Sequence, residues 1–286
     1  MDERGGSFVA VRRIPQGIDR GTGGCHSTSG SAAWIGRGLS CVCAQRRESD
    51  ARASFDLTPL QEGCLYRLKN RIEVTYDSSR PEHQEALRAL WSVAFPKEEL
   101  RDLVSDQWKQ MGWQGKDPST DFRGGGFISL ENLLFFGKTY PKSFQDLLRK
   151  QDGSRAMWEY PFAVAGVNIT FMLIQMLDLL SGLYYRHCCK FSNFGDADAE
   201  LVSLAAKPQS TVGLVFAKLL SENEWAFDLL YCVAFKMMDE QWLAMRATYM
   251  DFNSVMKATR AQLEKELLLE DIGRLEDMPS YRLLLQ

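Results

Sequence analysis

The sequence predicts an all-α protein built as one compact domain of many helices. Apolar residues recur at helical spacing in most segments after residue 58, and no segment alternates with the period of a strand over several residues. Of the 286 residues, 45% are hydrophobic and 25% are charged, a composition typical of a globular protein with one sizeable core. We expect a tail at 1–57, the helical domain at 58–270 and a C-terminal tail at 271–286.

Helical spacing begins near Thr58 and is clearest on both sides of a glycine-rich loop. Before the loop, segment 81–94 places Leu87, Leu90, Trp91 and Ala94 on one face. Pro96 then interrupts the pattern, and a second helix is expected over 97–111. Its predicted apolar face consists of Leu100, Leu103, Val104, Trp108 and Met111.

After the loop, Ser129 can cap a helix over 130–138, and a further short helix is expected over 143–150. A long apolar run, 160–185, has the length of a membrane span, which needs about 20 apolar residues. Asn168, Gln175 and Asp178 fall close to one face of this run. A single polar stripe with a carboxylate favours a buried core helix, and no transmembrane segment is expected.

The last third of the chain contains a helix predicted over 221–245. Ser221 and Glu224 stand at the spacing of a capping box. The helix continues with an apolar face formed by Phe227, Leu230, Tyr231, Ala234, Phe235, Met238 and Trp242. Segment 254–272 continues helically with charges on its outer faces, whereas 188–209 is expected to be irregular.

The first 54 residues differ from the rest of the chain. They contain nine of the 22 glycines, and eight arginines against five acidic residues leave a local net charge of +3. Such a segment buries too little apolar surface to offset its ordering entropy, so we expect a disordered tail. An organelle transit peptide and S-acylation at Cys41 and Cys43 are the alternatives.

Charge and cysteine content exclude several function classes. The formal net charge of -3 argues against non-specific nucleic-acid binding, which needs a clustered basic surface. Seven cysteines without an apolar leader fit reduced thiols in a cytoplasmic protein. The only cluster of His and Cys is His187, Cys188 and Cys189, whose adjacent side chains diverge, so we expect no metal site and no cofactor.

The loop from Gly112 to Phe127, GWQGKDPSTDFRGGGF, carries the candidate chemistry. It matches neither the Walker pattern nor the dinucleotide fingerprint, so a nucleotide site of its own is not expected. Three glycines follow Arg123 and allow close approach of another chain or a ligand. Two roles remain open from the residues alone: Arg123 meets phosphate oxygens, or it pairs with Asp117 or Asp121 and only pins the loop.

The loop and its surroundings resemble the ELMO (engulfment and cell motility) domain family. The shared signature is a Trp or Phe, here Trp113, then a D-P-x-x-D-F-R-G core and a helix with L-x-N-L-x-x-F. The likeness covers roughly residues 80–260 and is greatest to the short, single-domain members, with a leader and a D-F-R-G-G-G loop similar to those of land plants. Gly125 departs from the pattern, because many relatives have a bulkier residue there.

The resemblance implies regulation of small GTPases. Short members activate GTP hydrolysis by Arf and Arl GTPases, and the arginine of the core, here Arg123, is held to be essential. The resemblance also implies loop-shaping or partner-binding roles for Trp113, Asp117, Pro118, Asp121, Phe122, Gly124 and Gly126. The chain is then an activator of an enzyme, with Mg²⁺ and nucleotide supplied by the GTPase. The alternative is a non-catalytic adaptor that docks a GTPase or its exchange factor, in the cytoplasm or at membranes through its partner.

Overall fold

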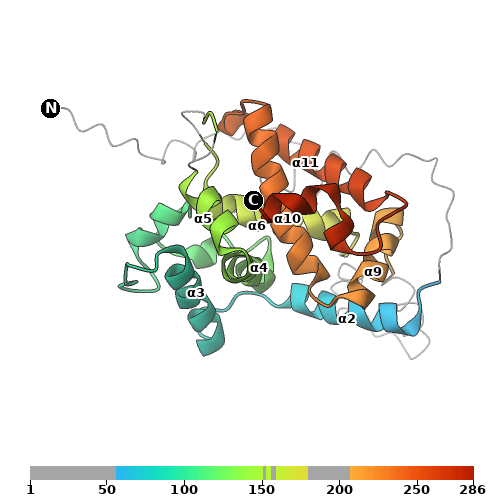
Figure 1. Cartoon of the computed structure of the whole chain (residues 1–286). Helices are drawn as coiled ribbons and strands as arrows, with labels where there is room; N and C mark the ends of the chain where they lie inside the picture. Colours follow the sequence, from blue (N-terminus) through green and yellow to red (C-terminus); the bar gives the residue numbers. More distant parts are fainter. Residues whose placement is uncertain (1–55, 151–152, 156–158, 180–206) are drawn as a thin grey trace, which may run out of the picture.

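The computed structural model of the chain describes residues 56–150, 153–155, 159–179 and 207–286. The expected disordered tail therefore lies outside the described residues, apart from its last two positions, as do Cys41, Cys43 and the cluster His187 to Cys189. All regular elements within the described ranges are helical, which confirms the all-α prediction. Figure 1 shows these helices packed into one body, with α10 near its centre.

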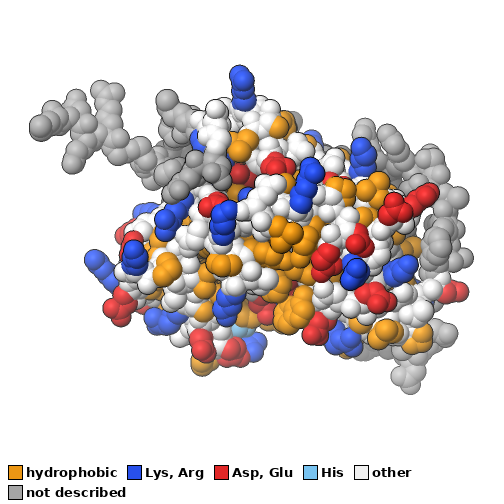
Figure 2. Space-filling model, viewed as in Figure 1, with side chains coloured by type: hydrophobic (Ala, Val, Ile, Leu, Met, Phe, Trp, Pro, Cys, Tyr) orange, Lys and Arg blue, Asp and Glu red, His pale blue; other side chains and the backbone are white. Residues whose placement is uncertain are grey.

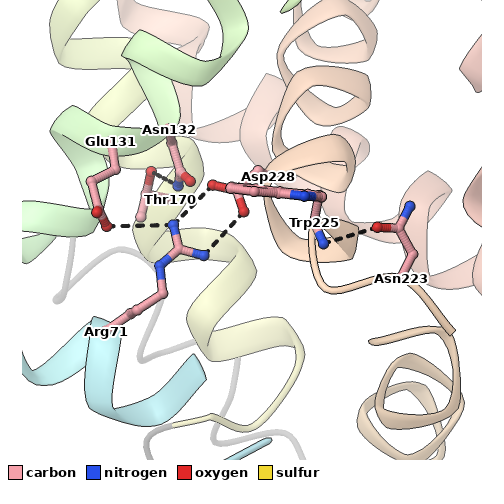
Figure 3. Close-up of polar contacts among 7 residues, drawn as sticks. All are labelled: Arg71, Glu131, Asn132, Thr170, Asn223, Trp225 and Asp228. Atoms are coloured by element: carbon pink, nitrogen blue, oxygen red, sulfur yellow. Dashed lines mark hydrogen bonds and ion pairs between the residues drawn. The ribbon is translucent and has the colours of Figure 1, made fainter. Parts of the chain in front are cut away.

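Helix α2, Pro59–Glu73, starts with a complete capping box. The Thr58 hydroxyl accepts the amide of Gln61 at 3.3 Å, and the Gln61 side chain accepts the amide of Thr58 at 3.0 Å. Near its other end, Arg71 donates to both carboxylate oxygens of Asp228, at 3.0 and 3.1 Å (Figure 3). The same guanidinium lies 3.4 Å from Glu131, so α2 is tied to α10 and α4.

Helix α3, Pro81–Ala94, confirms the first predicted helix, and its four expected apolar residues are buried. The helix predicted over 97–111 is wrong. Only η2, Asp106–Met111, is helical there, as a short 3₁₀ helix, and Val104 is 49% exposed. Hydrogen bonds from two indoles hold the preceding segment in a non-helical conformation: Trp91 donates to the carbonyl of Glu98, and Trp108 donates to that of Leu103.

Helices α4, Gly126–Thr139, and α5, Pro141–Arg149, follow the loop. Helix α4 starts earlier than predicted, at the last glycine of the loop. Ser129 is consequently not a cap: it lies inside the helix, fully buried, and its hydroxyl has no hydrogen-bond partner within the described residues. Gly125 occupies the N-cap position instead.

Helix α6, Phe162–Met176, is buried on nearly all sides, as a helix that is apolar all round must be. It packs against α4, α10 and α11. Its Asn168 and Thr170 are buried, and Thr170 accepts a hydrogen bond from Asn132 of α4 at 3.0 Å (Figure 3). Within the described ranges, no helix combines the length and the apolarity needed to cross a bilayer.

The predicted start of the helix over 221–245 is wrong, because two helices meet there. Helix α9, Thr211–Glu222, is capped by Ser210 and includes Ser221, whose hydroxyl donates to the carbonyl of Lys218. Helix α10, Ala226–Ala244, then begins without a side-chain cap. The expected apolar face of α10 is confirmed, since all seven of its residues are buried.

Two last segments complete the core. Helix α11, Phe252–Leu267, follows the short η4, Tyr249–Asp251, and packs against α10, α6 and α9. Residues 271–286, expected as a C-terminal tail, include η5, Leu275–Asp277, and η6, Pro279–Leu284, which pack against α10. The buried residues of this segment are Leu275, Met278, Leu283 and Leu284.

The visible surface mixes both signs of charge. In Figure 2, Lys and Arg side chains alternate with Asp and Glu over the whole face, and hydrophobic side chains gather near its middle. This view contains no continuous basic patch of the kind that binds a nucleic-acid backbone.

Candidate functional site

The loop 112–125 connects η2 to α4 and is anchored at its start by close packing against α6. Gly112 has a φ of 88°, which ends η2 in the left-handed region. A Cβ on Gly112 would lie only 2.6 Å from the backbone nitrogen of Phe162, so no larger residue fits there. The loop therefore begins at a point fixed by the body of the domain.

Asp117 organises the middle of the loop through backbone groups. Its carboxylate accepts the amide of Ser119 at 3.0 Å, and its carbonyl accepts the hydroxyl of Thr120 at 2.9 Å. These bonds cap the single turn η3, Pro118–Thr120, in which Pro118 is buried. The carbonyl of Lys116 accepts the amide of Ser105 at 2.8 Å, which joins the loop to the segment before η2. Asp117 thus acts as a local cap.

Asp121 points into the protein. Only 4% of the residue is exposed, and its carboxylate accepts the amide of Gln114 at 3.2 Å. Burial raises the pKa of Asp121 from 3.8 to about 6, the negative charge of Asp117 adds to this, and the Gln114 amide opposes it. No cationic side chain among the described residues pairs with this carboxylate. Asp121 is a buried acid held by a backbone amide.

The aromatic members of the signature form the base of the loop. Trp113 and Phe122 are both buried and meet edge to face, with ring centroids 5.1 Å apart. Trp113 also contacts Trp108, at 6.5 Å, and Phe122 contacts Tyr76, at 4.9 Å. These rings hold the residue on the N-terminal side of Arg123 in the core. Tyr76 was not singled out by the sequence, because nothing in its neighbourhood marks it.

Arg123 is exposed, in contrast to its neighbours in the signature. No hydrogen bond or ion pair joins its side chain to any residue that the structure describes. Asp117 and Asp121, the two carboxylates that could have pinned it, are bonded to backbone amides instead. The loop therefore presents one guanidinium to solvent with its five donors available.

The three glycines after Arg123 differ in what they do. A Cβ on Gly125 would lie 1.9 Å from the hydroxyl of Ser129, and one on Gly126, whose φ is 67°, would lie 3.0 Å from the carbonyl of Val74. These two glycines allow the loop to approach its own protein closely. Gly124, directly beside Arg123, is half-buried. Clearance for a partner rests on Gly124 and not on the whole triplet.

Other features of the described surface offer less chemistry. An open pocket of about 270 Å³ lies between α2, α9 and the start of α10, beside Trp225. Its Arg71 is already held by Asp228 and Glu131, and its Arg67 donates to the thiol of Cys64 at 3.1 Å. Within the described residues, no group of three His, Cys, Asp or Glu side chains is placed to hold a metal ion. The candidate site is the Arg123 loop.

Comparison with known proteins identifies the family. A model of the ELMO/CED-12 family matches residues 66–256, which include the loop and the helices that hold it. The chain belongs to the ELMO/CED-12 family. This family is linked to the regulation of small GTPases.

Named relatives agree with this assignment. The chain is 33% identical over 193 residues to ELMO domain-containing protein A of Dictyostelium discoideum, covering 68% of this chain and 19% of that protein. It is 30% identical over 212 residues to ELMO domain-containing protein C of the same organism, covering 74% and 31%. Human ELMO domain-containing protein 2 is 36% identical over 102 residues, covering 36% and 34%. The chain thus spans 19% to 34% of the length of these relatives. No solved structure matches it.

Proposed function

We propose that the protein stimulates GTP hydrolysis by a small GTPase of the Arf or Arl type, with Arg123 as an arginine finger supplied in trans. The observation that carries the proposal is the state of Arg123: it is exposed and has no partner within the described structure, although two carboxylates lie in the same loop. A guanidinium that only stabilised the loop would be expected to pair with one of them.

The chemistry required of Arg123 is limited. In GTP hydrolysis, negative charge develops on the oxygens around the transferred phosphoryl group, and an arginine finger that stabilises it accelerates the reaction by about 10³ to 10⁵. The GTPase supplies the nucleotide and Mg²⁺, so the activator needs neither a metal site nor a nucleotide pocket of its own. The guanidinium suits this role because it stays charged and bonds phosphate oxygens through two parallel donors.

The surrounding loop supports this role through preorganisation. Hydrogen bonds, a ring contact and burial hold five residues of the loop, which limits the movement of the backbone that carries Arg123. These residues are Trp113, Asp117, Pro118, Asp121 and Phe122. A fixed donor needs little reorganisation when it meets the transition state. Membership of a family linked to small GTPases supports the choice of partner class. The protein then acts at whichever membrane or cytoplasmic site its GTPase occupies.

Single-turnover hydrolysis of GTP, measured with a panel of Arf and Arl GTPases, tests the proposal. The wild-type protein should accelerate hydrolysis by at least one of them, and Arg123→Lys should remove most of the acceleration. Lysine is the sharper substitution because it keeps the charge and loses the two-donor fork. Arg101→Lys is the matched control, since Arg101 is an exposed arginine in the segment that precedes η2.

The outcomes separate activation from an adaptor role. If Arg123→Lys loses activity but still binds the GTP-bound GTPase, the finger is supported. If no GTPase responds to the wild-type protein, the proposed activation fails and the adaptor role is favoured. If Arg123→Lys is as active as Arg101→Lys, the protein stimulates hydrolysis without an arginine finger at position 123.

A further inference from the structure

The first turn of α4 is held by a segment far earlier in the chain. The carbonyl of Val74, just after α2, accepts the amide of Phe127 at 2.8 Å. A Cβ on Gly126 would lie 3.0 Å from the same carbonyl, so the two segments are in direct backbone contact. The carbonyl of Phe122 accepts the amide of Gly126 at 2.8 Å, which closes the turn that contains Arg123. The position of Arg123 therefore depends on this contact.

Two rings from outside the loop contact the residues on either side of Arg123. Tyr76 lies against Phe122, the residue before Arg123, with ring centroids 4.9 Å apart. His83 of α3 stacks on Phe127, after the glycines, at 3.8 Å and an interplanar angle of 12°. Tyr76 and His83 also contact each other, at 5.6 Å. The two rings thus form a continuous brace from Phe122 to Phe127.

His83 is itself fixed in one orientation and one charge state. It is 1% exposed, and its Nδ1 accepts the amide of Asp77 at 3.0 Å, which requires that nitrogen to be unprotonated. Burial lowers the pKa of His83 below its ordinary value, Arg80 adds to this, and Glu82 and Asp77 oppose it. The ring is consequently neutral at physiological pH and packs as an aromatic residue.

We propose that Tyr76 and His83 are positioning residues that hold the backbone on both sides of Arg123 in the conformation that presents its guanidinium to a GTPase. The functional part of this proposal rests on the proposed activity. The physical reason is that the side chain of Arg123 has no bond to any described residue, so the protein positions Arg123 only through its backbone. A finger whose backbone is free must pay ordering entropy at each encounter, and a misplacement of about 1 Å can cost a hundredfold in rate.

Hydrogen exchange tests the brace without any GTPase. In the full chain, Tyr76→Ala and His83→Ala should speed amide exchange in a peptide covering 122–128 by roughly threefold to tenfold, the factor expected from losing one aromatic pair. Tyr76→Phe should restore slow exchange because it keeps the ring. Leu263→Ala is the control for lost stability, since Leu263 is fully buried in α11, which packs against α10, α6, α9 and η4. If exchange in this peptide is unchanged in both alanine variants, or is equally fast in Leu263→Ala, the proposal that Tyr76 and His83 hold the loop is overturned.

Hydrolysis tests the functional part separately. With a GTPase that responds to the wild type, Tyr76→Ala and His83→Ala should lower the stimulated rate at saturating activator by roughly tenfold to a hundredfold, with half-saturation little changed. Tyr76→Phe should retain the wild-type rate. Wild-type rates in both alanine variants overturn the positioning role while the activity itself stands. If the wild type stimulates no GTPase, the proposed activity fails, and the exchange experiment alone decides whether the two rings hold the loop.

Discussion

Replacing Asp121 with asparagine is predicted to stabilise the protein at neutral pH. Asparagine keeps the size of the side chain and an oxygen that can accept the Gln114 amide, but it removes the ionisable group. The pKa of Asp121 is raised from 3.8 to about 6 in the folded state, a shift of about two units. Each unit corresponds to about 1.4 kcal/mol, so ionised Asp121 costs the folded protein about 3 kcal/mol. Only 4% of the residue is exposed, so screening by solvent is small.

The sign of the pH dependence follows from the raised pKa. The contribution of Asp121 to stability is fully present below pH 4 and is lost as the pH rises through about 6, because the folded state holds its proton longer than the unfolded chain. Asp121→Asn should therefore match the wild type near pH 4 and exceed it by up to about 3 kcal/mol at pH 7.5. When the two proteins are compared at the same pH, the contributions of other ionisable groups to the free energy of unfolding cancel. His83 is one such group, because its lowered pKa makes both proteins less stable in acid.

Urea unfolding followed by tryptophan fluorescence measures this difference between pH 4 and pH 8. Asp106→Asn is the control, because the Asp106 side chain is 77% exposed and its loss should leave the stability nearly unchanged at every pH. If Asp121→Asn is less stable than the wild type at pH 7.5, the carboxylate is stabilised as an anion in solution. The raised pKa of Asp121, and with it the description of this residue as a buried acid without a cationic partner, would then be refuted.

Two further predictions concern packing around the site. Gly125→Ala should destabilise the protein by about 1 to 3 kcal/mol, because its Cβ would lie 1.9 Å from the Ser129 hydroxyl. Adding Ser129→Ala should recover most of the lost stability, measured by thermal unfolding, because the Ser129 hydroxyl has no partner within the described residues. If the losses of the two substitutions simply add, the clash between the new Cβ and this hydroxyl is contradicted. Arg71→Ala should cost about 3 kcal/mol in urea unfolding, because it leaves Asp228, 1% exposed, as an unpaired buried charge. A loss under about 1 kcal/mol would mean that solvent screens the pair.

Helices with a strong apolar period could be predicted from the sequence, and their faces are confirmed. The predicted face of α10, from Phe227 to Trp242, is buried as expected, and the helix also buries Leu229, Val233 and Met237 outside that face. The same spacing over 97–111 was misleading. There, the indoles of Trp91 and Trp108 donate to the backbone carbonyls of Glu98 and Leu103, and such side-chain to backbone bonds cannot be seen in periodicity.

Capping signals were similarly ambiguous near helix ends. Ser221 has capping-box spacing to Glu224, yet Ser221 lies in the last turn of α9, where its hydroxyl bonds a carbonyl of the same helix. Ser129 follows the glycines, yet α4 already begins at Gly126, because the carbonyls of Phe122 and Val74 satisfy the first amides of the helix. In both cases a polar residue suited to a cap lies within a helix.

The candidate site could be predicted in part. The signature drew attention to Arg123, and the residue chemistry left open whether it was pinned by Asp117 or Asp121. The directions of those two carboxylates, one toward Ser119 and one toward Gln114, could come only from the three-dimensional arrangement. Tyr76 was outside any recognised pattern, because its contact with Phe122 joins parts of the chain that are distant in sequence.

The most direct test of the account is the single-turnover rate of GTP hydrolysis by a responsive Arf or Arl GTPase, measured with wild type, Arg123→Lys and Arg101→Lys at saturating concentration. The account predicts a rate close to that of the GTPase alone with Arg123→Lys, and the full stimulated rate with Arg101→Lys. Full stimulation by Arg123→Lys would contradict it.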